Sequence, residues 1–324
     1  MTAAIGIAGA GAFGAALAIA LARQGQTVRL WGRDTAAADR MAKTRRVPRL
    51  PGAVLPETVS VTARMEDLSD CPVVLLAVPM QALSGFLAMH AMALDGKPLV
   101  ACCKGIDLTT QKGPTALIAD ACPNGTAMIL TGPSFATDIA KGLATALTLA
   151  SLDEPASQRM QAVLSGPILR IYRNTDVPGA ELGGALKNVI AIASGIVMGA
   201  GLGESARAAL MTRGFAEMVR FSVRLGARPE TLMGLSGLGD LVLTCTSGQS
   251  RNYAHGVALG RGDCPDTAVT VEGVATSQAV LRQTMALGLL DELPVTSMIA
   301  QVTAGTITVP MAIQALMSRP LKEE

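Results

Sequence analysis

Aromatic and histidine residues are scarce in this sequence. Its 324 residues include one Trp, two Tyr, five Phe and two His, and aromatic residues make up 2% of the chain. Because half of the residues are still hydrophobic, the core must be built from Ala, Leu, Val, Ile and Met. These residues suit helices and buried parallel strands. With only His90 and His255 present, and no C-x-x-C pair among six cysteines, a metal site built by the protein is not expected.

The sequence also lacks an excess of either charge. It contains 27 Lys and Arg against 25 Asp and Glu, a net charge of +2, and no long basic stripe. Nucleic acid is therefore not an expected partner. The short basic cluster at Arg45, Arg46 and Arg49 is expected to lie in a solvated loop. The scattered cysteines fit a reducing cytosol better than a disulfide framework, which predicts a cytoplasmic location.

Two stretches without charged side chains need an explanation other than a membrane span. Met1–Ala22 has no basic region at its start and contains a glycine loop, so it is expected to form a strand and a helix and not a signal peptide. Leu293–Ser318 contains two prolines, two glutamines and several threonines, which favours two buried helices around a turn. The chain is therefore expected to be soluble, without membrane insertion.

A glycine loop near the start of the chain carries the strongest local signal. The apolar run Ile5–Ala8 is followed by Gly9, Gly11 and Gly14 with G-x-G-x-x-G spacing, then by an Ala-rich helical run and the β-prone run Thr27–Trp31. Strand, glycine turn, helix and strand within about thirty residues is the context that dinucleotide binding requires. The glycines could instead only shape a turn, but this context favours a nucleotide site.

Short strands alternate with helices up to about Asn174, and helical stretches dominate afterwards. This pattern predicts an α/β fold: an N-terminal doubly wound parallel sheet of the Rossmann type, followed by an all-α C-terminal domain. The expected domains are residues 1–176, which would bind the dinucleotide, and residues 177–324, which would carry substrate binding and catalysis. Further expected strands are Val59–Thr62, Val73–Val78, Leu99–Cys103, Ala127–Leu130 and Thr145–Ala150, and expected C-terminal helices include Ala180–Met198, Ala206–Leu225, Val274–Ala286 and Thr296–Gln301.

Charged side chains stand at unusual places in this pattern. Lys104 directly follows an apolar strand, where it is either a solvated lysine or a contact to an anion or substrate. Lys187 lies inside an apolar helix, so it either extends its amine to solvent or is paired or functional. Asp240 follows a glycine turn and either caps the next helix or takes part in the chemistry. Ser250-Arg251-Asn252 combines a hydroxyl, a guanidinium and an amide, a set suited to phosphate.

Together these motifs resemble one family over nearly the whole chain. The set G-A-G-A-F-G with W-G-R-D, L-P-G-A-V-L-P, K-G-I-D, T-G-P-S-F-A, A-L-K-N-V-I-A-I-A-S-G, G-L-G-D-L-V-L-T-C-T-S-x-x-S-R-N-Y and V-E-G is similar to bacterial-type NAD(P)-dependent sn-glycerol-3-phosphate dehydrogenases. The resemblance implies hydride transfer between the nicotinamide and carbon 2 of dihydroxyacetone phosphate, in the supply of glycerol 3-phosphate for phospholipids. A homodimer is the expected assembly.

The resemblance also implies roles for individual residues. The implied catalytic residues are Lys187, as proton donor and acceptor, and Asp240, which would orient it. The implied substrate contacts are Lys104, Gly132, Ser134, Lys187, Asp240, Ser250, Arg251 and Asn252. The implied cofactor contacts are Gly9, Gly11, Ala12, Phe13, Gly14, Arg33, Lys104, Ala136, Arg251 and Glu272, and no metal is required.

The choice between NADP(H) and NAD(H) depends on the end of the second strand. NAD-specific sites place an acid there for the ribose 2′-hydroxyl, but here Gly32 and Arg33 follow the strand. This favours NADP(H), with NAD(H) as the alternative and Asp34 as either a ribose ligand or a helix cap. Two other functions remain open at this point: a related two-domain NADP-dependent dehydrogenase of hydroxy acids or sugar acids, and a non-catalytic NADP-binding sensor.

Overall fold

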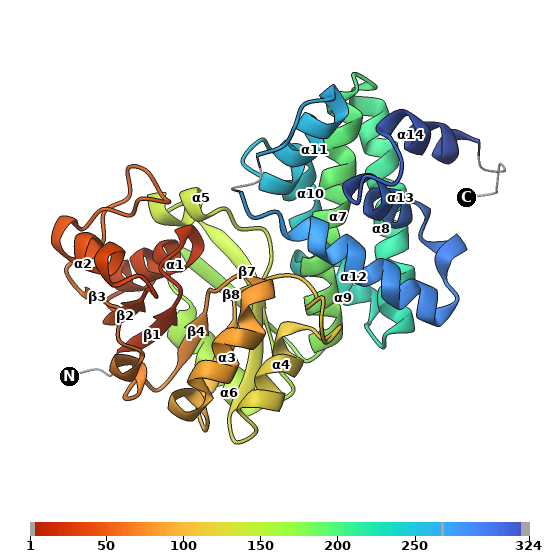
Figure 1. Cartoon of the computed structure of the whole chain (residues 1–324). Helices are drawn as coiled ribbons and strands as arrows, with labels where there is room; N and C mark the ends of the chain where they lie inside the picture. Colours follow the sequence, from red (N-terminus) through yellow and green to blue (C-terminus); the bar gives the residue numbers. More distant parts are fainter. Residues whose placement is uncertain (1–3, 267–268, 319–324) are drawn as a thin grey trace. The chain divides into compact units, whose positions relative to one another are not determined.

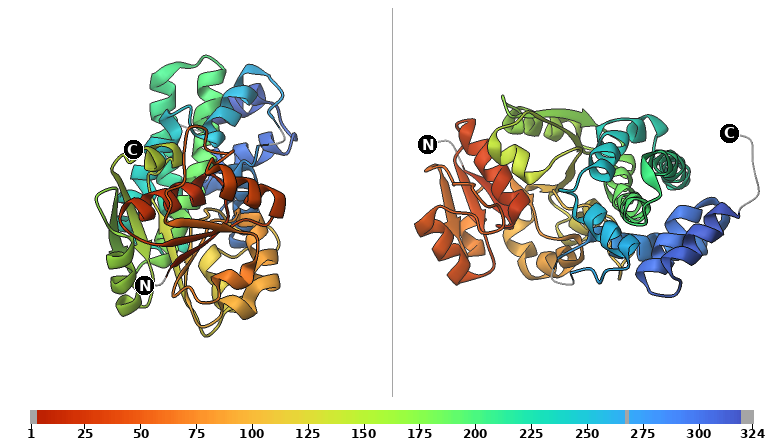
Figure 2. Two further views of the ribbon diagram at one scale, coloured as in Figure 1. Left: turned by 90° about the vertical axis from the view of Figure 1, so that its left-hand side faces the viewer. Right: turned by 90° about the horizontal axis from the view of Figure 1, so that it is seen from above.

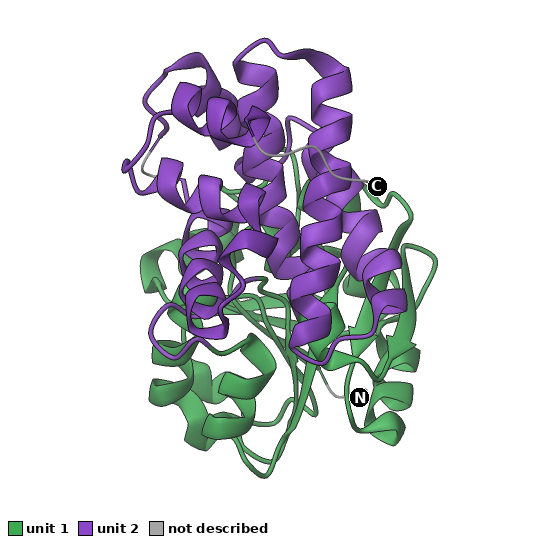
Figure 3. Cartoon of the chain, turned by 90° about the vertical axis from the view of Figure 1, so that its right-hand side faces the viewer, with its two compact units in different colours: residues 1–104, 112–181 green, residues 105–111, 182–324 purple. Residues whose placement is uncertain are grey.

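The computed structural model describes residues 4–266 and 269–318, and the chain divides into two compact units (Figure 3). The sheet unit comprises Met1–Lys104 and Lys112–Glu181. The helical unit comprises Gly105–Gln111 and Leu182–Glu324. The short segment Gly105–Gln111 thus belongs to the helical unit, although its neighbours in sequence on both sides belong to the sheet unit.

The sheet unit is built on one eight-stranded sheet with the order β3-β2-β1-β4-β5-β6-β7-β8 (Figure 1). Neighbouring strands pair in parallel, except that β6 and β7 are antiparallel. The first six strands have the order of a classical dinucleotide-binding sheet, in which the order reverses between β1 and β4. The strands are β1 Ile5–Ala8, β2 Val28–Trp31, β3 Val59–Thr62, β4 Val74–Leu76, β5 Pro98–Ala101, β6 Thr126–Thr131, β7 Thr145–Ala150 and β8 Leu169–Asn174.

Helices cover both faces of this sheet, as the views in Figure 2 also show. Alternate strand residues enter two cores, so that Ile5 and Ile7 of β1 pack with one set of helices and Ala8 with the other. The first core takes residues from α1, α2, α5 and α6, and the second from α3, α4 and the short helix η1. The helices of this unit are α1 Ala12–Arg23, α2 Thr35–Thr44, η1 Met65–Leu68, α3 Met80–Leu94, α4 Pro114–Ala121, α5 Ala136–Lys141 and α6 Glu154–Leu164.

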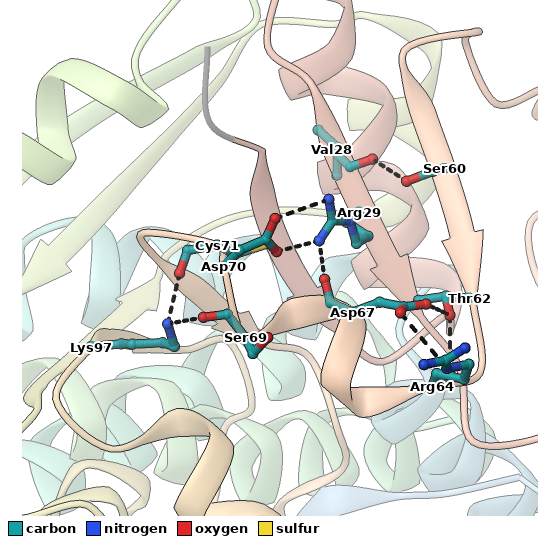
Figure 4. Close-up of polar contacts among 10 residues, drawn as sticks. All are labelled: Val28, Arg29, Ser60, Thr62, Arg64, Asp67, Ser69, Asp70, Cys71 and Lys97. Carbon is teal, nitrogen blue, oxygen red and sulfur yellow. Dashed lines mark hydrogen bonds and ion pairs between the residues drawn. The ribbon is translucent and has the colours of Figure 1, made fainter. Parts of the chain in front are cut away.

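Polar contacts fasten the loop between η1 and β4 (Figure 4). Arg29 of β2 hydrogen-bonds the carboxylate of Asp70, and this bond lowers the pKa of Asp70. The ammonium of Lys97 donates to the carbonyl oxygens of Ser69 and Cys71 at 2.6 and 3.1 Å. Ser69, Asp70 and Cys71 precede β4 and Lys97 precedes β5, at the amino ends of these strands. Ligands bind at the carboxyl ends of such sheets, so we interpret this cluster as structural.

The basic cluster at residues 45–49 is not wholly solvated, which corrects the sequence expectation. The guanidinium of Arg45 is partly buried and donates to the carbonyl oxygens of Leu55, Pro56 and Val59. Val47 and Leu55 of the proline-rich segment are buried as well. A segment rich in proline has few backbone partners for its carbonyl groups, and the five N–H donors of one arginine can satisfy several of them.

The helical unit is centred on α7, Val177–Gly199, which belongs to this unit from Leu182 onward. From Leu182 to Val197 every residue of α7 is buried. Within the described residues α7 is the one helix long and apolar enough to cross a membrane, but 83% of its most apolar window is buried inside the protein, as in a core helix. The remaining helices are α8 Gly203–Arg224, α9 Pro229–Met233, η2 Leu235–Gly239, α10 Asp240–Thr246, α11 Arg251–Arg261, α12 Glu272–Leu287, η3 Leu290–Glu292, α13 Pro294–Thr303 and α14 Val309–Met317.

The predicted fold class is confirmed: a mostly parallel sheet precedes a helical region. The uncharged C-terminal stretch forms two helices, α13 and α14, separated by a turn as predicted. The expectation that both are buried is wrong for α14, in which Ala312 is buried while Met311 and Met317 are exposed. The domain boundary at residues 176 and 177 stays a prediction.

Candidate active site

The glycine loop has the geometry that a dinucleotide requires. Gly9 has φ +124°, and a Cβ there would lie 2.6 Å from the carbonyl oxygen of Ala77. A Cβ at Gly14 would overlap the carbonyl oxygen of Gly9, so this glycine lets α1 pack closely against β1. A Cβ at Gly11 would meet nothing within 4 Å. The protein itself thus does not require glycine at this position, which fits a pyrophosphate approaching the backbone there.

The start of α1 adds hydrogen-bond donors to this loop. The helix begins at Ala12 after an extended Gly11, and its first intrahelical bond runs from Ala15 N to Gly11 O at 3.0 Å. The N–H groups of Ala12 and Phe13 precede that bond and carry the positive end of the helix dipole. An anion at this point would be stabilised by both. The residues therefore fit the phosphates of NAD(P), as the sequence predicts.

Asp34, just after β2, was predicted to be either a ribose ligand or a helix cap. Its carboxylate accepts from the backbone N–H of Ala37 at 2.8 Å and caps α2. The cap is therefore the role that the structure supports for Asp34. Arg33 is exposed beside it, and its role toward a 2′-phosphate stays a prediction.

Three predicted residues of the sheet unit meet at the carboxyl ends of β5 and β6. The Lys104 ammonium donates to the carbonyl oxygen of Gly132 at 3.0 Å, and the Ser134 hydroxyl donates to the same oxygen at 3.0 Å. Lys104 is half-buried and so is not an ordinary solvated lysine. Ala136 begins α5 and packs against the same core as Ala12 and Phe13, at the start of α1.

In the helical unit, a buried ion pair joins α7 to α10. The Lys187 ammonium lies 3.0 Å from Oδ1 of Asp240 and donates to the Thr244 hydroxyl at 2.7 Å. Lys187 is 7% and Asp240 1% exposed, so the lysine does not extend to solvent. Asp240 is the first residue of α10, and the N-cap position before it is occupied by Gly239. The carboxylate and the hydroxyl fix the direction of the ammonium, as the predicted role of proton donor requires.

Thr244 belongs to this cluster, although the sequence reasoning did not single it out. Its hydroxyl donates to Asp240 Oδ1 at 3.2 Å. The signal that could have found it is its spacing: residues i and i+4 share one face of a helix. The neighbouring Cys245 is buried, and burial raises the pKa of its thiol to about 11. This thiol therefore stays protonated at neutral pH and is no candidate nucleophile.

The Ser250-Arg251-Asn252 triplet forms the start of α11. Ser250 is the N-cap, and its hydroxyl oxygen accepts from Tyr253 N at 3.2 Å. Arg251 is exposed at the first helical position. The amide of Asn252 is buried, donates to Asn188 Oδ1 at 2.9 Å and accepts from Gly273 N at 2.9 Å. The triplet thus offers a helix N-terminus and a guanidinium to an anion, with the Asn252 side chain already engaged.

Asn188 lies between the Lys187 ion pair and the start of α11. No role was predicted for it from the sequence. It follows Lys187 on α7, and its Oδ1 accepts the bond from Asn252 of α11. Glycines permit this approach, because a Cβ at Gly195 would overlap the carbonyl oxygen of Tyr253 and one at Gly256 that of Ile192. Glu272 stands at the start of α12, next to Gly273, and so lies near α11 as well.

The predicted site residues therefore form two groups, each within one unit. The glycine loop, Lys104, Gly132, Ser134 and Ala136 lie at the carboxyl edge of the sheet, and the Lys187 pair and the start of α11 lie in the helical unit. In the part of the chain that the structure describes, no three His, Cys, Asp or Glu side chains are grouped as ligands for a metal ion. The individual roles stay predictions.

Comparison with known proteins identifies the family. Residues 4–157 match the family described as NAD-dependent glycerol-3-phosphate dehydrogenase N-terminus, and residues 176–314 match its C-terminus. Relatives called glycerol-3-phosphate dehydrogenase [NAD(P)+] are 58% identical in Cereibacter sphaeroides and 56% in Paracoccus denitrificans. These alignments cover 99% of this chain, with 100% and 99% of those proteins.

A solved structure agrees with the sequence relatives. The glycerol-3-phosphate dehydrogenase of Coxiella burnetii is 35% identical, and the alignment covers 98% of this chain and 99% of that chain with a TM-score of 0.93. Both halves of the chain thus match the same enzyme family, in sequence and in fold. The chain belongs to the NAD-dependent glycerol-3-phosphate dehydrogenase family.

Proposed function

We propose that this protein interconverts dihydroxyacetone phosphate and sn-glycerol 3-phosphate with NAD(P)H. The family membership makes it an NAD(P)-dependent oxidoreductase acting on a small phosphorylated molecule. The observation that carries the residue assignment is the buried Lys187–Asp240 pair with Thr244. The reduction of a ketone needs a proton for the developing alkoxide, and this pair supplies a lysine held in a fixed position.

In the proposed mechanism Lys187 gives its proton to the oxygen on carbon 2 of the substrate. Asp240 and Thr244 hold the ammonium by bonds of 3.0 and 2.7 Å and so fix its direction. In the reverse direction the lysine accepts the proton of the hydroxyl. When bound, the nicotinamide would supply or receive the hydride at that carbon.

The start of α11 is proposed to hold the phosphate group. The backbone N–H groups of Arg251 and Asn252 lie in the first turn of the helix, and the Arg251 guanidinium adds charge and directed donors. Ser250 accepts the bond from Tyr253 with its oxygen, so its hydroxyl proton can still be donated. The Asn252 side chain is expected to orient this helix end through Asn188 and Gly273, while its backbone contributes to phosphate binding.

The remaining assignments complete the proposal. Gly9, Gly11, Gly14, Ala12 and Phe13 would hold the pyrophosphate, and the exposed Arg33 would favour a 2′-phosphate, hence NADP(H). Lys104, Gly132 and Ser134 would contact the substrate, Lys104 also the cofactor, and Arg251, Ala136 and Glu272 would lie along the cofactor. We further propose a cytoplasmic homodimer that supplies glycerol 3-phosphate for phospholipid synthesis.

The decrease of absorbance at 340 nm in NADPH tests the activity directly. We expect oxidation of NADPH that depends on dihydroxyacetone phosphate, and none with 2-oxo acids at the same concentration. Turnover of a 2-oxo acid alone would indicate a hydroxy-acid dehydrogenase. NADPH binding with no turnover of either substrate would indicate a cofactor sensor, and either result would overturn the proposal.

A further inference from the structure

The segment Gly105–Gln111 follows Lys104 directly but is built into the helical unit. Ile106 and Asp107 are 3% and 4% exposed, and Ile106 belongs to the same core as α7 and α12. One carboxylate oxygen of Asp107 accepts from Thr109 N at 3.2 Å and from Thr110 N and Oγ1 at 2.7 and 2.8 Å. The segment is therefore a closed turn with a buried anchor and not a loose connection.

Two neighbouring side chains of α12 fasten this turn. Arg282 Nη1 donates to the carbonyl oxygen of Leu108 at 3.1 Å, and Gln283 Nε2 donates to that of Gln111 at 2.9 Å. At its other end the same helix is bonded to α11, through Gly273 N and Asn252 Oδ1. Helix α12 thus connects the segment that follows Lys104 to the helix end proposed to bind phosphate.

We propose that Arg282 and Gln283 are positioning residues for Lys104. This inference rests on the role proposed for Lys104 above. Gly105 has φ +143°, and it is the single residue between Lys104 and the buried Ile106. Holding Leu108 and Gln111 in place therefore restrains the backbone from which the Lys104 side chain extends. Without the two side chains the turn keeps its Asp107 bonds and the packing of Ile106 but loses these two hydrogen bonds to α12, so that the ammonium of Lys104 samples more positions.

The test compares variants of one helix. The variant Arg282→Ala with Gln283→Leu removes both bonds to the turn. The matched control is Gln278→Leu, which removes a similar bond on α12, from Gln278 Nε2 to the Ala300 carbonyl oxygen of α13 at 2.7 Å. We expect the double variant to lose about tenfold in kcat/KM for dihydroxyacetone phosphate, since small displacements of a contacting group reduce rates strongly. The control should keep its kcat/KM within about twofold. Equal losses in the two would overturn the proposal.

A double-mutant cycle with Lys104→Ala then separates positioning from stability. If Arg282 and Gln283 act through Lys104, adding their substitutions to Lys104→Ala should lower kcat/KM by no more than about twofold further. The same tenfold loss in both backgrounds would overturn the inference while leaving the proposed function intact. Activity unchanged in Lys104→Ala itself would instead reject the role of Lys104, and the inference with it.

Two milder variants keep the test usable if the double variant folds poorly. Gln283→Leu alone can be tested in the parent and in Lys104→Ala. It should lower kcat/KM in the parent and have little further effect in Lys104→Ala. Arg282→Lys retains a donor for the Leu108 carbonyl and should keep most of the activity that Arg282→Ala loses. A lysine variant as impaired as the alanine variant would count against positioning by this hydrogen bond.

Discussion

The buried Lys187–Asp240 pair should contribute to folding and to catalysis in ways that two variants separate. At the 3.0 Å between Nζ and Oδ1, two unit charges attract by about 6 kcal/mol at an effective dielectric constant of about 20. Lys187→Met removes this attraction and leaves the carboxylate of Asp240, which is 1% exposed, without the positive charge of the lysine. Because the lysine no longer has to be desolvated, the net loss of unfolding free energy should be roughly 3–5 kcal/mol.

Adding Asp240→Asn should restore much of that stability without restoring activity. The double variant has neither charge in the core, so we expect at least about 2 kcal/mol of the loss to return. Its kcat should stay about 10² to 10⁴ below that of the parent, because the proton donor is still absent. Urea unfolding measures the first quantity, and NADPH oxidation with dihydroxyacetone phosphate the second. A double variant with near-parental turnover would refute the catalytic role, and one less stable than Lys187→Met would refute the energetic reasoning.

Three further predictions concern other parts of the molecule. Arg33→Ala should raise the KM for NADPH more than that for NADH, and equal effects in steady-state assays with both cofactors would reject the assignment of Arg33 to the 2′-phosphate. Gly11→Ala should leave the unfolding free energy within about 1 kcal/mol, since a Cβ there meets nothing within 4 Å, but should weaken NADPH binding by about tenfold or more in a fluorescence titration. Burial raises the pKa of Glu217 from 4.5 to about 7, although its carboxylate accepts bonds from Val295 N and Thr296 N and lies near Arg220. The folded state thus holds this proton more tightly than the unfolded chain, so the stability that Glu217 contributes is present below pH 4.5 and is lost as pH rises through 7. Relative to Glu217→Gln, the parent should lose up to roughly 3 kcal/mol between pH 4.5 and 8 in urea unfolding, and parallel pH profiles would contradict this.

The sequence predicted seven of the eight strands that the structure describes, because most strands of such a sheet are short runs of apolar and β-branched residues. Val59–Thr62 and Thr145–Ala150 are strands with the predicted bounds. It did not predict β8, Leu169–Asn174, in which buried Leu169 and Ile171 alternate with the exposed Arg170 and Tyr172. An alternation of apolar and polar residues is typical of a half-buried strand, so the sequence did contain a signal for this edge strand. The antiparallel pairing of β6 and β7 depends on how the segment that connects them packs, and no local sequence pattern indicates this.

The sequence indicated which residues form the candidate site, but only some of the contacts between them. A lysine inside the apolar helix α7 needs a partner for its charge, and Asp240 was predicted to orient it. The contribution of Thr244 depends on α10 starting at Asp240, and a helix boundary is among the features that sequence reading places least well. The pairing of Asn252 with Asn188 depends on the close approach of α7 and α11, which joins residues 64 positions apart in the chain.

The most direct test of the central claim follows the hydride itself. NADPH carrying deuterium at carbon 4 of the nicotinamide, on the face that is transferred, is incubated with dihydroxyacetone phosphate and the protein, and the product is analysed by NMR and mass spectrometry. We predict sn-glycerol 3-phosphate with one deuterium on carbon 2, formed in equal amount to the NADPH consumed. No such product with either deuterated face of NADPH or of NADH, or deuterium at another carbon, would contradict the account.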